Sequence, residues 1–314
     1  MKKLGLCLAA LCLMIVMATP LRAEVCFIDD SGQSIRLEKA FSRIISLYGA
    51  HTENLFSLGL DQEIIGVSIN DSYPTAALNR PRFSYRDDPE RLLAARPDLV
   101  LVRPMIMRGY RGLVESLRQA GVTVVSLQPR DVSQMFGYWR KLGALTGRQA
   151  QAETMVERFK KELSQLKSRV AGVSPEARPK VYFESIHRRY KTFAQSSMAI
   201  FALEAAGGLN LATGARPVRG SNIASFGKER ILSLAQRMDV YLAQKGPMNR
   251  VSVEEIMDEP GFRALKAVKE QRVYIVDEKL VSRPTLRLLQ GIAAIQNLLY
   301  PRLASASART GGRP

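Results

Sequence analysis

The stretch that decides the fold is residues 43–67, RIISLYGAHTENLFSLGLDQEIIGV. The apolar run at 44–47 predicts a strand that stops before Gly49. Leucines at 55, 58 and 60 predict a helix after the glycine, and the apolar run at 64–67 predicts a second strand. Strand, turn, helix and strand in this order form the repeating unit of parallel α/β sheets. This unit therefore predicts an α/β fold.

The loop between the first strand and the helix carries three side chains with useful chemistry. Tyr48 offers a phenol, His51 an imidazole and Glu53 a carboxylate. Open α/β sheets bind ligands at the carboxyl ends of their strands, which is where this loop lies. The loop is therefore the first candidate for a ligand site.

Residues 1–23 read as a separate segment. Lys2 and Lys3 precede an apolar core at 4–18, Pro20 breaks that core, and Ala23 offers a small residue before a cleavage point. This pattern predicts a secretory signal peptide, and the apolar core is too short for a membrane-spanning anchor. Because the lipoprotein type of cleavage disfavours a residue as large as the leucine before Cys12, we expect a free periplasmic protein rather than a lipid-tethered one.

Charge and cysteine content narrow the possible partners. Loss of three basic residues with the signal peptide would lower the net charge from +17 to +14 and leave Cys26 as the one remaining cysteine. One cysteine cannot form an internal disulfide, so we expect Cys26 to be a buried apolar residue, with an intermolecular disulfide as the alternative. The basic residues are scattered among acids, and an exported protein does not meet nucleic acid. The charge therefore indicates either a basic solvated surface or a positive cleft for an anionic ligand.

The order of predicted elements divides the chain into two lobes. Strands and helices alternate through an N-terminal lobe at 24–147. An apolar stripe with helical spacing then predicts a long bridging helix at 148–171, and a second α/β pattern fills a C-terminal lobe at 172–303. The tail 304–314 has the composition of a disordered segment. We therefore expect two Rossmann-like lobes with parallel sheets, joined by one helix, with a ligand cleft between them.

The two lobes match each other coarsely in sequence. PDLVL at 97–101 parallels MDVYL at 238–242, and each run follows a short predicted helix that carries a glutamate, Glu90 or Glu229. The match predicts that both lobes use one structural plan.

Taken together, several runs resemble a known family. They are RIIS at 43–46, the pair Thr52-Glu53, ARPDLV at 95–100 and AAGGLN at 205–210. In order and spacing they resemble the periplasmic substrate-binding proteins of ABC importers for ferric siderophores, haem and cobalamin, over most of 25–302. The resemblance implies a helix-linked two-lobe protein with little hinge motion that hands a small molecule to a membrane permease. It also implies one permease-docking glutamate on each lobe, Glu53 and Glu229, and we expect a monomer.

Residues that follow the predicted strands are the candidates for the cleft lining. In the first lobe they are Tyr48, His51, Ser68, Tyr85, Arg86 and Arg103. In the second lobe they are Glu184, His187, Arg188, Arg189, Tyr190, Lys245, Arg250 and Arg283. Arginine dominates the set, and its planar guanidinium group suits carboxylates and other anionic oxygens. Arg103, which directly follows a buried strand, is the strongest single candidate, and Arg283 is the next.

The sequence argues against a bare metal ion and against catalysis. A direct metal site needs two or more close ligands, and the two histidines, His51 and His187, fall in different lobes. As the alternative, they could meet across the cleft, where Tyr48 or Tyr190 could add a phenolate that suits ferric iron or haem. There is no Gly-x-Ser-x-Gly turn, no cysteine–histidine pair after export and no phosphate-binding glycine loop. We therefore expect no catalytic residue, no resident cofactor and no direct metal ligand set.

The expected ligand is a small metal chelate. An anionic ferric siderophore-type complex ranks first, and haem or a cobalamin-type corrinoid is the alternative. A non-transport interaction protein on the same fold is the rival from another functional class.

Overall fold

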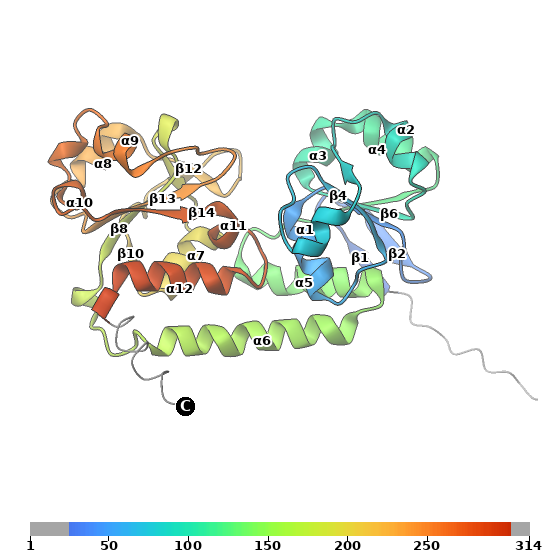
Figure 1. The fold of residues 1–314 in the computed structure, drawn as a ribbon, viewed down its shortest axis with the longest axis horizontal. Helices are drawn as coiled ribbons and strands as arrows, with labels where there is room; N and C mark the ends of the chain where they lie inside the picture. The colour runs from blue at the N-terminus through green and yellow to red at the C-terminus, as the bar shows by residue number, and fades with distance from the viewer. Residues whose placement is uncertain (1–24, 303–314) are drawn as a thin grey trace, which may run out of the picture.

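The computed structural model describes residues 25–302, which form two α/β lobes side by side with one long helix beneath both (Figure 1). That helix, α6 (Gln149–Ser168), has 20 residues and a length of about 30 Å. The predicted bridging helix is therefore present, although it is shorter at its C-terminal end than the range 148–171. Among residues 25–302 no helix is both long and apolar enough to cross a membrane. The predictions for the segments 1–23 and 304–314 lie outside the described residues.

The first lobe is built on a five-stranded parallel sheet with the order β5-β4-β3-β6-β7. Its strands are β3 (Ile44–Ser46), β4 (Ile64–Ser68), β5 (Arg82–Phe83), β6 (Leu99–Val102) and β7 (Thr123–Ser126). Its helices are α1 (Gly49–Ser57), α2 (Pro89–Ala94), α3 (Pro104–Gly109), α4 (Arg111–Gln119) and α5 (Val132–Thr146). A hairpin of β1 (Val25–Ile28) and β2 (Ser34–Leu37) precedes the sheet. The strand–helix–strand unit predicted at 43–67 is confirmed.

The second lobe has a seven-stranded mixed sheet. Its parallel strands are β8 (Lys180–Ile186), β10 (Leu209–Asn210), β13 (Val240–Lys245) and β14 (Val273–Asp277). Three strands extend it in antiparallel fashion, β9 (Lys191–Phe193), β12 (Ile223–Ser225) and β11 (Arg216–Pro217). The turn from β8 to β9 passes through η3 (His187–Arg189) and Tyr190, whose φ of 47° is in the left-handed region. The sequence did not predict this extension, because three-residue polar strands carry no clear period-2 pattern.

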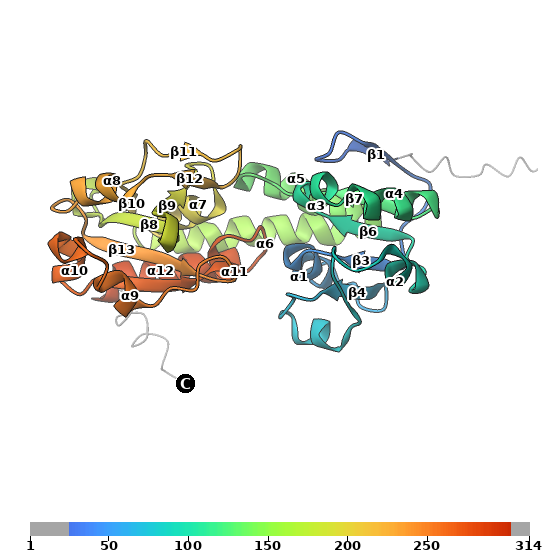
Figure 2. The same cartoon turned by 90° about the horizontal axis from the view of Figure 1, so that it is seen from above.

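The helices of the second lobe are short, except for two that pack on the core. They are α7 (Met198–Ala205), α8 (Lys228–Ser233), α9 (Val253–Met257), α10 (Lys266–Lys269), α11 (Glu278–Val281) and α12 (Leu288–Leu299). Seen from above in Figure 2, α6 runs between the lobes beneath the sheets, with α5 on one side and α12 on the other. Residues of both lobes and of these helices, among them Trp139, Phe159 and Ile292, form one continuous apolar core. The two lobes therefore share a core.

One aspartate in each lobe performs the same structural task. The Asp98 carboxylate accepts hydrogen bonds from the backbone N–H groups of Ser42 and Arg43, each at 2.9 Å, just before β3. The Asp239 carboxylate accepts from the backbone N–H of Lys180 at 2.9 Å, where β8 begins, and from Lys266 Nζ at 2.6 Å. Each aspartate stands just before one strand and holds the start of its parallel neighbour. The predicted match between 97–101 and 238–242 is thus confirmed in the sheet geometry.

The loop 282–287, which joins α11 to α12, enters the first lobe and is called the interlobe loop below. The Pro284 carbonyl oxygen accepts hydrogen bonds from Asn54 Nδ2 and Trp139 Nε1, both at 3.0 Å. Beside it, Arg283 Nη1 donates to Glu53 Oε1 at 3.0 Å, and the Glu53 side chain is 1% exposed. Arg287 Nη1 approaches the same oxygen at 3.5 Å. These contacts connect the lobes independently of the bridging helix.

The interlobe ion pair predicts a large stability effect. Arg283→Ala should lower the free energy of unfolding by about 3–5 kcal/mol, because it leaves a buried carboxylate without its partner. Adding Glu53→Gln to that variant should recover much of the loss. Urea denaturation measures both changes.

The Arg80–Asp61 pair is the matched control. It is shorter, at 2.6 Å, but its side chains are 21% and 53% exposed. Arg80→Ala should therefore cost no more than about 1 kcal/mol. Equal losses for Arg80→Ala and Arg283→Ala would contradict the role of burial in the interlobe pair.

Candidate functional site

The carboxyl edges of the two sheets lie toward each other. After β14, Lys279 Nζ donates to Ser72 Oγ of the first lobe at 2.8 Å. After β3, α1 carries Glu53, which pairs with Arg283 of the second lobe. In Figure 1, β14 leads directly to α11 at the junction of the lobes. The segments that directly follow β3 and β14 therefore lie at this junction.

Tyr48 and Arg103 form the first cluster at the edge of the N-terminal lobe. Both side chains are half-buried, and the Arg103 guanidinium carbon lies 4.5 Å from the centre of the Tyr48 ring. Arg103 Nε is buried and has no hydrogen-bond partner among the described residues. Burial raises the pKa of Tyr48 although Arg103 and Arg283 act to lower it, so the phenol stays protonated at neutral pH. The cluster offers a cation and a neutral phenol.

A second cluster of the same lobe joins Tyr85, Arg86 and Tyr110. The two tyrosine rings pack edge to face with centres 4.7 Å apart, and Arg86 Nε lies 3.4 Å from the Tyr110 hydroxyl oxygen. Arg86 is exposed. Sequence reasoning missed Tyr110, because it ends a short helix where no element was predicted.

The second lobe carries a pocket of about 680 Å³ at the carboxyl ends of β8 and β13. Four predicted residues line it together: His187, Arg188, Arg189 and Arg250. The loop 247–251 supplies the facing wall, including Met248, which is 59% exposed. The motif HRRY at 187–190 and the β13 loop, far apart in sequence, thus build one site.

His187 lies between two carboxylates at the base of this pocket. Its Nδ1 is 3.0 Å from Glu184 Oε2, and its Nε2 is 3.6 Å from Glu259 Oε2. Burial lowers the pKa of His187, but the hydrogen bond and charge of Glu184, helped by Glu259, outweigh it and raise the pKa above its usual value. His187 therefore carries positive charge over a wider pH range than a free histidine. Glu184 itself is fully buried and also accepts a hydrogen bond from the Tyr241 hydroxyl, so it supports His187 and does not line the pocket.

The acids around the pocket already have partners, whereas several cations do not. Glu255 closes the capping box of α9 with Ser252. Glu259 accepts hydrogen bonds from Tyr190 at 2.8 Å and Lys228 at 2.5 Å. Among residues 25–302, six of the predicted cations form no ion pair: Arg86, Arg103, Arg188, Arg189, Lys245 and Arg250. The site is therefore suited to an anion.

The prediction that His51 contacts a ligand is wrong. The side chain is fully buried in the first lobe, with Nε2 3.1 Å from the Val102 carbonyl oxygen and Nδ1 2.7 Å from the Tyr138 hydroxyl. Because the carbonyl can only accept, Nε2 carries the proton and Nδ1 accepts from Tyr138. Burial lowers the pKa of His51 to about 3, so the ring is neutral. The loop brings the backbone near the edge but turns this side chain inward.

Two further assignments change with the structure. Glu53 cannot reach a permease surface, because it is buried in the ion pair with Arg283. Burial raises the pKa of Glu53, although Arg283 and Arg287 act to lower it. Arg283 is 8% exposed and is engaged with Glu53, so it is a structural residue and not a free ligand contact. The sequence predicted a role for each residue from its position after a strand. It carries no local pattern that shows the two side chains pairing across the lobes.

Of the remaining predicted residues, some are exposed and others form hydrogen bonds within their own lobe. Lys245 and Glu229 are exposed. Ser68 is buried, and its backbone N–H donates to Asp71 Oδ2 at 3.1 Å. Tyr190 is half-buried, and its hydrogen bond to Glu259, with burial, raises the pKa of its phenol, which disfavours a phenolate ligand. Within 25–302, no three His, Cys, Asp or Glu side chains converge as a metal site.

The two histidines predict opposite pH dependences. A raised pKa in the folded state means that His187 contributes stability below about pH 6.5, which is lost as the pH rises through the folded pKa. The lowered pKa of His51 means that its contribution is present above about pH 6.5 and is lost as the pH falls.

Urea denaturation at pH 5.5 and 8.5 tests this pair. The destabilisation caused by His187→Gln should be larger at pH 5.5, and that caused by His51→Gln should be larger at pH 8.5. Each variant is the control for the other, since both remove one of the chain's two histidines. The same pH trend in both variants would contradict the assigned protonation states.

Comparisons with known proteins agree with this architecture. A family model described as periplasmic binding protein matches residues 44–280. The uncharacterized ABC transporter substrate-binding lipoprotein YvrC of Bacillus subtilis is 25% identical over 282 residues, covering 87% of this chain and 84% of the relative. A cobalamin-binding protein of Halobacterium salinarum is 25% identical over 279 residues, covering 87% and 73%.

A solved structure adds a three-dimensional match. A possible iron-binding (periplasmic solute-binding) protein from Staphylococcus epidermidis superposes with a TM-score of 0.73 at 26% identity, over 83% of this chain and 100% of that one. The predicted fold class and family resemblance are confirmed. The family match covers most of the chain, and the relative from Bacillus subtilis is described as an ABC transporter substrate-binding lipoprotein. The chain belongs to the periplasmic binding protein family and is a substrate-binding protein of the ABC-transporter type.

Proposed function

We propose that this protein captures an anionic metal chelate between its lobes in the periplasm, and that a ferric siderophore-type complex is its cargo. The observation that supports this most directly is the group of cations without ion-pair partners among residues 25–302 at both sheet edges. Guanidinium groups donate to anionic oxygens in a fixed planar geometry, and a charge-assisted hydrogen bond is stronger than a neutral one. A chelate whose oxygens face outward would meet Arg103 from one lobe and the arginines of the His187 pocket from the other.

The protein framework supplies little motion for this capture. The shared core and the interlobe loop hold the two edges at a set separation. Preorganised side chains lower the ordering cost of binding. Because no ligand set of His, Cys, Asp or Glu converges within 25–302, recognition would act on the outer atoms of the chelate and not on its metal.

A corrinoid is the second candidate. The relative from Halobacterium salinarum is described as cobalamin-binding and aligns over most of this chain. Half-buried Tyr48, Tyr85 and Tyr110 at the first-lobe edge would suit the flat faces of a macrocycle. The cations favour the anionic chelate over the corrinoid, and haem, which carries carboxylates on an apolar ring, ranks between them.

Isothermal titration calorimetry decides among these ligands. The panel contains a ferric tris-catecholate, ferric citrate, haemin and cyanocobalamin. We expect the anionic ferric chelates to bind with an affinity that falls as salt rises. Arg103→Ala should weaken that binding about 10-fold or more, as expected for loss of a charge-assisted hydrogen bond.

Arg169→Ala is the matched control, because Arg169 is exposed at the end of α6, away from the sheet edges. Its effect on affinity should be within twofold. Binding of cyanocobalamin alone, or equal effects of the two arginine variants, would refute the anionic-chelate proposal.

Delivery to the permease would use one exposed glutamate on each lobe. Glu90 and Glu229 each lie in the first turn of a six-residue helix, α2 and α8, that leads to the equivalent strands β6 and β13. Both side chains are exposed, and Figure 1 places both helices on the side of the molecule opposite α6. Glu90 thus takes the position that Glu53 cannot fill. Two separated acids would orient docking on a basic permease surface and raise the association rate.

Charge reversal at both positions tests the docking surface. Glu90→Arg with Glu229→Arg should reduce ligand uptake about 10-fold or more in cells that depend on this protein, through lost steering and like-charge repulsion. Ligand affinity measured by calorimetry should not change.

The control reverses two exposed glutamates on the α6 side, Glu157 and Glu176 in η2 (Pro175–Ala177). That double variant should retain uptake. Loss of ligand affinity in the Glu90/Glu229 variant would place these residues in the ligand site, and unchanged uptake would remove them from docking.

A further inference from the structure

A second pocket of about 660 Å³ lies where both lobes meet the bridging helix. Three segments line it: the start of α5, the C-terminal half of α6, and α7 with the residues before it. This volume falls within the range of roughly 300–1,000 Å³ that is typical of small-molecule sites. It is separate from the sheet edges, since none of its lining residues belongs to the clusters described above.

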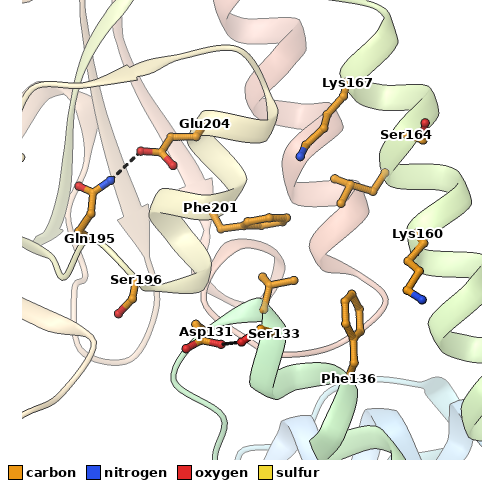
Figure 3. A pocket seen from close by; sticks show the side chains of 12 residues that line it. Asp131, Ser133, Phe136, Lys160, Ser164, Lys167, Gln195, Ser196, Phe201 and Glu204 are labelled. Carbon is orange, nitrogen blue, oxygen red and sulfur yellow. Dashed lines mark hydrogen bonds between the residues drawn. The ribbon is translucent and has the colours of Figure 1, made fainter.

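The floor of this pocket is apolar. Val132, Phe136, Leu163 and Phe201 converge there from all three segments, and each is only partly buried although it packs on the main core. Figure 3 shows Phe136 and Phe201 pointing toward the same space from opposite sides. Phe136 is held in place by edge-to-face contacts with Trp139 and Phe159 at 5.8 and 5.7 Å. An apolar chain would complete the burial of these side chains.

Two lysines of α6 form one wall of the pocket (Figure 3). Lys167 Nζ lies 5.7 Å from the centre of the Phe201 ring and has no ion-pair partner among residues 25–302. Lys160 Nζ lies 5.9 Å from the centre of the Phe136 ring and pairs with Glu157 at 2.8 Å. The side chains of that pair are 50% and 67% exposed, so the ion pair holds Lys160 only weakly.

The two acids of the pocket are already engaged. The Asp131 carboxylate caps α5 by accepting from the Gln134 backbone N–H at 2.8 Å and from Ser133 Oγ at 2.7 Å. Glu204 Oε1 accepts from Gln195 Nε2 at 2.7 Å on the wall opposite Lys167 (Figure 3). These carboxylates are held by neutral donors on the α5 and α7 sides of the pocket. On the α6 side, the Lys167 ammonium has no ion-pair partner among residues 25–302 and lies beside the Phe201 ring.

We propose that this pocket binds an amphiphile with an anionic head, such as a long-chain carboxylate. Its acyl chain would lie between Phe136 and Phe201, and its head group would pair with Lys167, with Lys160 as a second contact. Because the pocket walls come from both lobes and the bridging helix, such a ligand would contact all three at once. It would raise the melting temperature increasingly as its concentration exceeds its Kd.

Calorimetry with three dodecyl compounds below their micelle concentrations tests the proposal. Dodecanoate should bind with 1:1 stoichiometry, while dodecyltrimethylammonium and dodecyl maltoside should bind at least 10-fold more weakly. Lys167→Gln should weaken dodecanoate binding about 10-fold. Ser164→Trp, which fills the pocket from an exposed position on α6, should abolish it.

Lys161→Gln is the matched control, since Lys161 is exposed on the same helix but does not line the pocket. It should leave the affinity unchanged, and the melting temperatures of the free variants confirm that each is folded. Equal binding of the cationic and anionic compounds, or dodecanoate binding that survives Ser164→Trp, would overturn the proposal. A dimer of this chain that dissociates on Ser164→Trp would also overturn it, in favour of a protein contact.

Discussion

The buried ion pair between Arg283 and Glu53 is the contact on which the arrangement of the two lobes depends. It stands beside the Pro284 carbonyl, which accepts two hydrogen bonds from the other lobe. Removing two charges from water is costly, and breaking the pair would leave one charge buried without a partner. The interlobe loop therefore stays where Arg283 Nη1 reaches Glu53 Oε1. Together with the bridging helix α6, it gives the lobes two separate connections, and a structure held at two points bends less than one held by a single linker.

A fixed arrangement of lobes has a consequence for recognition. On the function proposed above, the ligand would be met by side chains that already stand at the two sheet edges. Among the cations at these edges, Arg103 is held against the Tyr48 ring. His187 is held between Glu184 and Glu259 and keeps its proton more firmly than a free histidine. Preorganised positive charge of this kind attracts anions from a distance and limits the entropy lost on binding.

The repeated plan of the lobes explains how one chain presents two comparable surfaces. Asp98 and Asp239 each accept a backbone hydrogen bond at the start of a neighbouring parallel strand. The same pair of strands is therefore aligned in the same way in both sheets. Their carboxyl ends face each other, and the helices that carry Glu90 and Glu229 lie on one side of the molecule (Figure 1). The bridging helix lies on the other side, where its lysines and the flanking aromatic residues form the pocket of Figure 3.

The sequence by itself determined the α/β class, the strand–helix–strand unit at 43–67, the bridging helix and the family. These features are written in local periodicity and in the order of short runs, which do not depend on distant contacts. It also indicated that arginines follow the strands. Only the tertiary structure decided which way each side chain points. His51 turns inward because Tyr138 and the Val102 carbonyl satisfy both ring nitrogens. Glu53 and Arg283, separated by 230 positions, neutralise each other across the lobes. Such pairings depend on burial and on contacts remote in sequence, and no local pattern encodes them.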